Sequence, residues 1–152
     1  MNFKKLSQEQ AIPQVKQYCV YRERCHSEVK EKLYSLGLYK NDVEQLMAQL
    51  IEENYLNEQR FAIQYAGGKF RMNQWGRVKI KYALRQKQVS EYSIKKALKQ
   101  ISEADYKKTL QKLAEQKLKT LKNETNSFSK KKKLQDYLLQ KGYEGELVRE
   151  II

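Results

Sequence analysis

The order of apolar and polar positions along this chain repeats three times. The first copy contains Val29, Leu33, Gly37, Leu38, Val43, Leu46 and Met47. The second contains Ile80, Leu84, Gln88, Val89, Ile94, Ala97 and Leu98, and the third contains Leu134, Leu138, Gly142, Tyr143, Val148, Ile151 and Ile152. Because apolar residues three or four positions apart share one face of a helix, each copy predicts two consecutive amphipathic helices.

A tight turn is expected between the two helices of each copy. Gly37 stands where the end of a helix requires a positive φ, and Leu38 is placed to pack back across that turn. Gln88 occupies the glycine position in the second copy. The cap there is therefore expected to differ from the others or to be slightly strained.

Each pair of helices is preceded by another helical stretch. Apolar spacing predicts these helices from Ile12 to about Arg24, from Glu58 to about Met72 and from Glu103 to about Leu121. Pro13 suits a first helical turn. The sequence thus predicts an all-α fold, an elongated tandem array of three three-helix repeats at residues 1–56, 57–102 and 103–152.

One segment also fits a strand. Residues 77–82 alternate polar and apolar side chains, but the repeat aligns them with residues 26–31, which do not alternate. No partner strand is apparent elsewhere in the sequence, so helix is the favoured interpretation. On a helix, Arg77, Lys81 and Arg85 would share one face and form a basic stripe.

The net charge of the 152-residue chain is +13, and most of it lies in the second repeat. Residues 1–56 hold 8 basic and 8 acidic residues, residues 57–102 hold 11 and 2, and residues 103–152 hold 12 and 8. Such a patch favours a polyanionic partner, most simply nucleic acid, over a solvated face that happens to be basic. The residues predicted to bind are Lys69, Arg71, Arg77, Lys79, Lys81, Arg85, Lys95, Lys96, Lys130, Lys131, Lys132 and Lys133.

The run from Lys130 to Lys133 leaves two interpretations open. If Ser129 caps a helix, four lysines crowd the positive end of its dipole, and this unfavourable arrangement indicates contact with phosphate or an acidic protein face. The other interpretation is a flexible, solvated linker before Leu134.

The chain holds eleven tyrosines, of which Tyr65, Tyr82 and Tyr92 lie near basic residues. Such rings can stack on bases. Tyrosine also packs its ring in a small core while its hydroxyl stays in water, and this packing role is the favoured interpretation.

No arrangement typical of an enzyme is apparent. Cys19, Cys25 and His26 are too few and too close together to complete a tetrahedral zinc site. Six residues of helix separate the two thiols by about 9 Å of rise, which argues against a disulfide. Gly67-Gly68 lacks the spacing of a phosphate-binding loop. We therefore predict no catalytic residue, no metal and no cofactor.

Composition bounds the class and compartment of the protein. Six glycines and one proline are few for the turns of a β-sandwich. No segment approaches the roughly 20 apolar residues of a membrane span, and Met1–Gln10 lacks the apolar run of a signal peptide. We expect a monomeric cytoplasmic protein with reduced thiols.

Three segments of the sequence contain short motifs, which follow one another along the chain. They read R-E-R-C-H-S-E-V at residues 22–29, N-Y-L-N-E-Q-R-F-A at residues 54–62 and Q-W-G-R-V-K-I at residues 74–80. These resemble the R-E-R-S-x-x-E-L, G-Y-L-D-D-x-R-F-A and K-G-x-x-x-I-x-x-E-L motifs of the RecX family, and the resemblance covers essentially the whole chain. The departures are Cys25 for serine, Asn57 for aspartate, Ala83 for glutamate and Gln88 for glycine.

The resemblance implies a small bacterial regulator of the RecA recombinase. Such a protein would lodge in the helical groove of the RecA filament on single-stranded DNA and limit filament growth, ATP hydrolysis, strand exchange and co-protease activity. Its partners would be RecA and single-stranded DNA, contacted directly or within the filament. Tyr55, Leu56, Arg60 and Phe61 would hold the first two repeats together. The alternative is a basic helical protein that binds nucleic acid without RecA.

Overall fold

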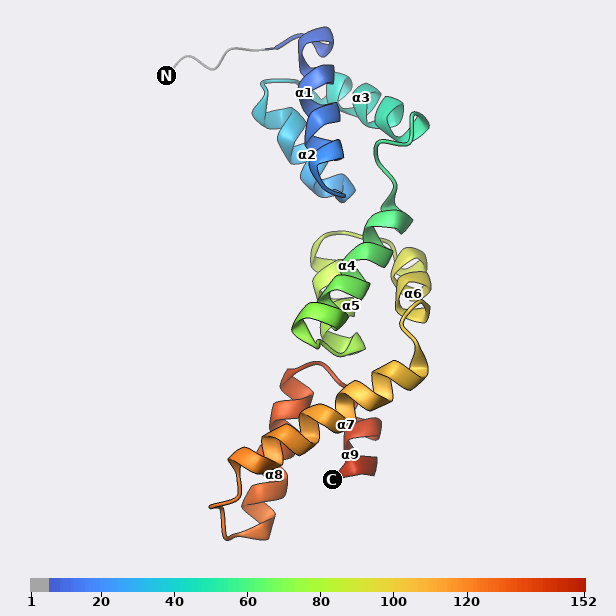
Figure 1. Cartoon of the computed structure of the whole chain (residues 1–152). Helices are drawn as coiled ribbons and strands as arrows, with labels where there is room; N and C mark the ends of the chain where they lie inside the picture. Colours follow the sequence, from blue (N-terminus) through green and yellow to red (C-terminus); the bar gives the residue numbers. More distant parts are fainter. Residues whose placement is uncertain (1–5) are drawn as a thin grey trace, which may run out of the picture.

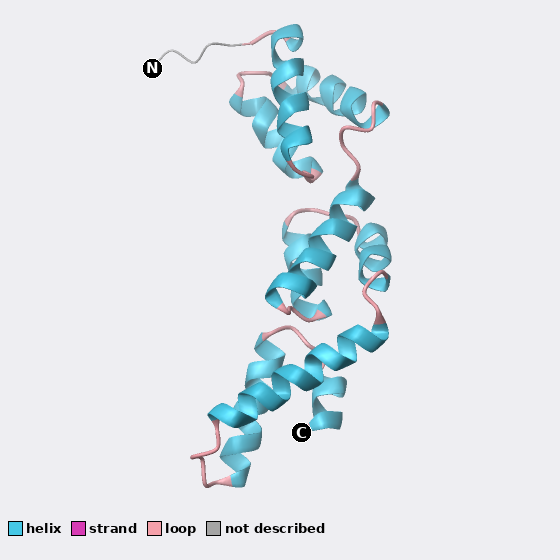
Figure 2. Cartoon of the chain, in the orientation of Figure 1, coloured by secondary structure: helices cyan, strands magenta, loops and turns pink. Residues whose placement is uncertain are grey.

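The computed structural model describes residues 6–152, which form nine helices and no strands (Figures 1 and 2). The helices are α1 (Gln8–Tyr21), α2 (His26–Ser35), α3 (Lys40–Glu52), α4 (Glu58–Asn73), α5 (Arg77–Gln86), α6 (Glu91–Lys99), α7 (Glu103–Thr120), α8 (Ser127–Gln140) and α9 (Gly145–Ile151). They follow one another in three groups of three along an elongated molecule (Figure 1). We name these groups the first, second and third repeats. The predicted all-α tandem array is confirmed.

The segment with the strand-like alternation is helical, because residues 77–82 lie within α5. No helix among the described residues is long and apolar enough to cross a membrane. The expectation that residues 1–10 lack a signal peptide concerns in part residues 1–5, which lie outside the described residues.

The turn between the second and third helices has the same backbone conformation in every repeat. The φ angles are 88° at Gly37, 63° at Gln88 and 101° at Gly142. Gln88 thus keeps the left-handed conformation without being a glycine, at the steric cost that a Cβ imposes there. The residues that follow the turn, Leu38, Val89 and Tyr143, are buried as the pattern predicts.

The first helix begins earlier than the sequence indicates. The Ser7 hydroxyl accepts a hydrogen bond from the backbone N–H of Gln10, whose side chain accepts one from the Ser7 N–H. This capping box starts the helix at Gln8. Pro13 therefore lies inside the helix, and the prediction that it occupies the first turn is wrong. Its ring leaves the carbonyl of Glu9 without a helical N–H partner.

Helix α8 also begins earlier than predicted. Asn126 caps it, since its side chain accepts hydrogen bonds from the backbone N–H groups of Phe128 and Ser129. A cap at Ser129 is therefore wrong, and so is a flexible linker, because residues 127–140 are helical. Lys130 ends the first turn of α8, and Lys131 to Lys133 follow that turn, where the helix dipole has less effect.

The described residues form two hydrophobic cores. The first lies within the first repeat and contains Val15, Leu33 and Leu46 among its buried side chains. The second runs without a break from α4 to α9 and so joins the second and third repeats. Cys25, which precedes α2, is fully buried in this second core. The first repeat is thus anchored to the second by a side chain at the start of α2.

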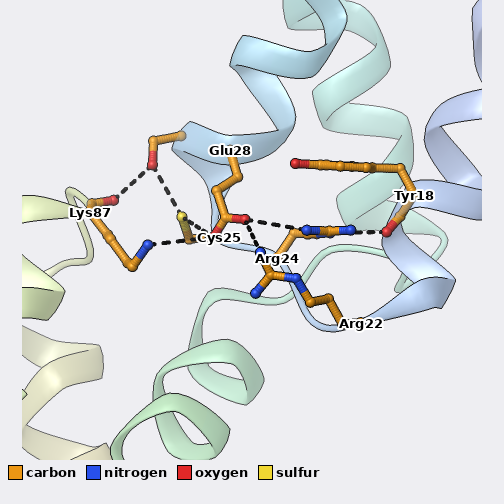
Figure 3. A network of polar contacts seen from close by, with 7 residues as sticks. Tyr18, Arg22, Arg24, Cys25, Glu28 and Lys87 are labelled. Atoms are coloured by element: carbon orange, nitrogen blue, oxygen red, sulfur yellow. Dashed lines mark hydrogen bonds and ion pairs between the residues drawn. The ribbon is translucent and has the colours of Figure 1, made fainter.

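The R-E-R motif forms a polar network at this joint (Figure 3). The Glu28 carboxylate lies 3.3 Å from Arg22, 3.7 Å from Arg24 and 3.9 Å from Lys87 of the second repeat. The Cys25 thiol donates a hydrogen bond to the same carboxylate at 3.2 Å. Three cations thus surround one carboxylate, and their attraction holds Glu28 at the joint between the first two repeats.

The second motif meets the first across the joint. Arg60 of α4 forms an ion pair with Glu23 and donates a hydrogen bond to the Asn54 carbonyl at 3.1 Å. On either side of Arg60, Leu56 is buried in the first core and Phe61 in the second. Tyr55 packs partly buried against the first core. We propose that Tyr55, Leu56, Arg60 and Phe61 are structural and hold the first two repeats together.

The joint between the second and third repeats is a close backbone contact. The Gly76 N–H donates to the Lys141 carbonyl at 2.8 Å, and the Val78 N–H donates to the Gly142 carbonyl at 2.9 Å. A Cβ on Gly76 would lie 2.3 Å from the carbonyl carbon and oxygen of Gly142. Glycine is therefore required at position 76 for the two repeats to approach this closely.

Candidate nucleic-acid interface

Lysine and aromatic side chains alternate along one face of the second repeat. The Lys79 and Lys69 ammonium nitrogens lie 4.7 Å and 4.9 Å from the centroid of the Trp75 ring. The Lys69 and Lys87 nitrogens lie 5.5 Å and 5.7 Å from the centroid of the Tyr65 ring. We call these five residues the lysine–aromatic row. Each of its lysines contacts at least one ring.

Local structure places the members of the row. Tyr65 and Lys69 lie one turn apart on α4 and so share a face. Gln74 ends this helix with a φ of 58°, and the N–H of Trp75 then bonds back to the Lys69 carbonyl at 3.2 Å. This turn folds the tryptophan back toward α4. Lys79 follows on α5, one turn after Trp75.

The row combines aromatic rings that pack on the hydrophobic core with lysines whose charges are mostly not paired with acidic side chains. The rings of Tyr65 and Trp75 are half-buried and pack against the second core. Within residues 6–152, neither Lys69 nor Lys79 forms an ion pair, and Lys87 lies 3.9 Å from Glu28. The cations of the row therefore remain largely available to an external anion.

A second basic surface lies between α5 and α6. Lys81, Lys95 and Lys99 line a groove there together with Arg77, Glu91 and the apolar side chains of Ile94 and Leu98. Lys79 and Lys81 are two residues apart on a helix, so their side chains point about 200° apart. Arg77 and Lys81 of the predicted stripe both line this groove, whereas Lys79 lies on another face of α5. We call this second surface the lysine groove.

The two arginines of the predicted stripe each form ion pairs with carboxylates of the same chain. Arg77 forms ion pairs with Glu103 at 2.9 Å and Glu144 at 3.0 Å, both in the third repeat. Arg85 pairs with Glu91 through two contacts, at 2.5 Å and 3.1 Å. Arg77 therefore fastens the second repeat to the third, and neither guanidinium is as available to a partner as the lysines.

The other predicted residues lie apart from the row. Arg71 is exposed on α4, and Lys96 lies 4.7 Å from the centroid of the exposed Tyr92 ring. Lys130, Lys131, Lys132 and Lys133 lie on α8, and the last two form ion pairs with Asp136 and Glu124. These lysines form a third basic region, and the structure does not join it to the row.

The thiols do not form a reactive site. Cys19 and Cys25 are free and buried. Burial raises the pKa of both thiols, so they stay protonated at neutral pH and are poor nucleophiles. Within the described part of the chain, no group of three or more His, Cys, Asp and Glu side chains is placed to hold a metal ion.

Sequence reasoning overlooked Trp75 and assigned Tyr65 a packing role. The tyrosine and Lys69 could have been paired from their i, i+4 spacing on a basic helix. Trp75 lies beyond the end of α4, and its approach to Lys69 depends on the left-handed residue before it. That conformation at a glutamine is not visible in a sequence.

Comparison with known proteins identifies the repeats. The family model described as "RecX, second three-helix domain" matches residues 57–98, and "RecX, third three-helix domain" matches residues 103–152. The first range covers α4, α5 and all but the last residue of α6, and the second covers α7–α9.

Two curated relatives are also named after RecX. "Regulatory protein RecX" of Clostridium perfringens (strain 13 / Type A) is 35% identical over 130 residues, which are 85% of this chain and 60% of that relative. The protein of that name from Bacillus cytotoxicus is 24% identical over 142 residues, which are 93% of this chain and 52% of the relative. The chain thus spans between 52% and 60% of the length of these relatives.

A solved structure has the same fold. The crystal structure of RecX from Lactobacillus salivarius matches with a TM-score of 0.86 at 23% identity, and the match covers 95% of this chain and 93% of that one. Another structure, titled "Crystal structure of regulatory protein RecX", matches with a TM-score of 0.86 at 24% identity over 95% of this chain and 70% of its own. On the two repeat matches and the named relatives, the chain belongs to the RecX family.

Proposed function

We propose that this protein is a regulator that binds the RecA filament on single-stranded DNA and lowers its ATPase, strand-exchange and co-protease activities. The observation that carries the proposal is an elongated array of RecX-family repeats whose positive charge is concentrated in the middle repeat. We further propose that it acts as a monomer in the cytoplasm.

The shape suits an extended partner. Each repeat contacts only its neighbours, so the surface that the array offers is long and continuous. A filament of protein subunits on DNA offers a correspondingly long groove lined with phosphates and protein side chains. A protein that occupies such a groove can hinder movements of the subunits without any catalytic residue.

The charge suits a polyanion. The second repeat carries 11 basic and 2 acidic residues, and the row and the lysine groove place part of this excess on two of its faces. Positive potential of this kind speeds association with a negatively charged partner and weakens as salt is added.

Binding to the filament tests the proposal. The chain is mixed with RecA from the same genome, with RecA plus ATP and single-stranded DNA, and with the DNA alone, and each mixture is centrifuged to pellet filaments. We expect the chain to pellet with the filament and to stay in solution with RecA that has not assembled. Equal amounts in the pellet with and without RecA on the DNA would contradict the proposal.

The alternative function is direct nucleic-acid binding without RecA, as in a helix-turn-helix protein. It predicts affinity for duplex DNA at least equal to that for single-stranded DNA, because such proteins place a helix in the major groove. A preference for the RecA filament over bare duplex of the same length argues against it.

A further inference from the structure

We infer that the lysine–aromatic row is a contact surface for single-stranded nucleic acid, on which the rings of Trp75 and Tyr65 stack with bases and the lysines hold phosphates. The inference rests on the proposed function, because it names the component of the DNA-bound filament that the second repeat contacts. Its test uses no RecA, so the two proposals can fail separately.

The alternation of the row carries the inference. Four neighbouring distances between an ammonium nitrogen and a ring centroid lie between 4.7 Å and 5.7 Å, in the order Lys79, Trp75, Lys69, Tyr65, Lys87. A single strand presents a phosphate and a base in the same alternation. Proteins that bind single strands without sequence preference combine basic side chains along the backbone with rings under the bases.

Other polyanions fit the row less well. In a duplex the faces of the bases are covered by their neighbours, so a ring on the protein surface cannot stack on them. An acidic peptide would use the lysines and leave the rings without a partner. The lysine groove holds Lys81, Lys95 and Lys99 without an aromatic side chain and lacks this feature.

The lysines can exchange their present contacts for phosphates. A lysine that lies over a ring at an exposed site has a weak attraction to it, and a phosphate offers a stronger, charge-assisted hydrogen bond. When Lys69 and Lys79 turn to phosphates, they uncover the faces of the rings. The rings themselves are held by their packing against the second core, so little order has to be gained.

The row extends from one joint of the array to the other. At one end, the Lys87 carbonyl accepts a hydrogen bond from the Ser27 hydroxyl of the first repeat at 3.0 Å. At the other end, Lys79 is adjacent to Gly142 of the third repeat, whose Cβ, if present, would lie 2.3 Å from the Lys79 Cβ. A strand bound on the row would therefore run along the length of the second repeat.

Trp75 is the only tryptophan in the chain, so its fluorescence reports directly on the row. The probes are oligodeoxythymidylate of about 12 nucleotides, within the site sizes of single-strand binders, an abasic oligonucleotide of the same length, and a duplex of that length. We expect oligodeoxythymidylate to quench the fluorescence and to bind more tightly than either other probe. Equal affinity for the abasic probe, or no quenching at saturation, would overturn the inference.

Two substitutions test the rings. Trp75→Leu and Tyr65→Leu keep an apolar side chain on the core and remove the stacking surface. The matched control is Tyr82→Leu, which removes a ring on α5 that is 65% exposed and has no lysine over it. Because Trp75→Leu removes the only tryptophan, binding of these variants is followed by the fluorescence anisotropy of dye-labelled probes. Each ring variant should bind oligodeoxythymidylate about 5-fold to about 150-fold more weakly, and the abasic probe as the wild type does. If ring variants and control bind alike, the inference fails.

A second pair of variants tests the lysines and does not depend on the rings. Lys69→Gln with Lys79→Gln removes two charges from the row, and Lys95→Gln with Lys99→Gln removes two from the lysine groove. The row variant should lower the slope of log affinity against log salt by about 1.4, since each phosphate contact on a single strand contributes about 0.7. The same change in both variants would mean that the charge acts without a defined site.

Discussion

Replacing Gly142 by alanine should loosen the third repeat from the second. Gly142 has a φ of 101°, and its carbonyl accepts the hydrogen bond that the Val78 N–H donates across the joint at 2.9 Å. A Cβ at this position would lie 2.3 Å from the Lys79 Cβ and 2.8 Å from the Lys79 backbone nitrogen. Non-bonded carbon atoms normally approach to about 3.5 Å, so the backbone must shift.

Two costs set the size of the effect. A residue with a side chain in this backbone conformation costs about 1 to 3 kcal/mol. Forcing one extra carbon into a close-packed contact costs about 1 to 3 kcal/mol more. The free energy of unfolding of the joined second and third repeats should therefore fall by about 2 to 6 kcal/mol.

Urea unfolding followed by Trp75 fluorescence measures this change, because Trp75 precedes the Gly76 contact and packs on the shared core. With a typical urea dependence, the midpoint should fall by about 1 to 3 M. The control is Gly68→Ala in α4, where a Cβ meets nothing within 4 Å. That change should raise stability by about 0.5 to 1 kcal/mol. If Gly142→Ala unfolds at the wild-type midpoint, the close joint is not as described.

Three further changes test other parts of the fold. Asn57→Ala removes the cap bond to the Arg60 N–H at 2.9 Å and should cost about 1 kcal/mol in urea unfolding, whereas Asn57→Asp should cost nothing; equal losses would count against the cap. Tyr106→Phe removes the hydrogen bond that the buried hydroxyl donates to Glu144 and the one that it accepts from the Arg77 N–H at 2.9 Å, and should cost about 1 to 3 kcal/mol in urea unfolding; an unchanged midpoint would count against these bonds. Burial lowers the pKa of His26 below its ordinary value, so folding favours the neutral imidazole. The protonation of His26 therefore leaves the free energy of unfolding unchanged above pH about 6.5 and lowers it as the pH falls below that value. His26→Gln should flatten this decline between pH 7.5 and 5.5, and an unchanged pH dependence would exclude His26 as its source.

The sequence predicts helices well here because each repeat buries a regular apolar face. Ile80 and Leu84 are fully buried on α5 although the neighbouring side chains alternate like those of a strand. The internal repeat resolved that ambiguity, since the aligned residues 26–31 have helical spacing alone. The errors lie at helix starts, where Ser7 and Asn126 cap the chain before the positions expected.

The candidate site was only partly predictable. Lys69 and Lys79 were expected from charge alone, but charge could not show that Arg77 is occupied by two carboxylates of the third repeat. Those partners lie 26 and 67 residues further along the chain, at Glu103 and Glu144. Which cations stay free depends on contacts between repeats, and such contacts follow from the three-dimensional arrangement.

The rate of ATP hydrolysis by RecA on single-stranded DNA tests the central claim most directly. The chain is titrated against RecA from the same genome at fixed DNA, and its helicity is checked by circular dichroism in the same buffer. The proposed function predicts that the rate falls steadily and reaches its minimum at or below one chain per RecA subunit. An unchanged rate at excess of the folded chain would contradict it.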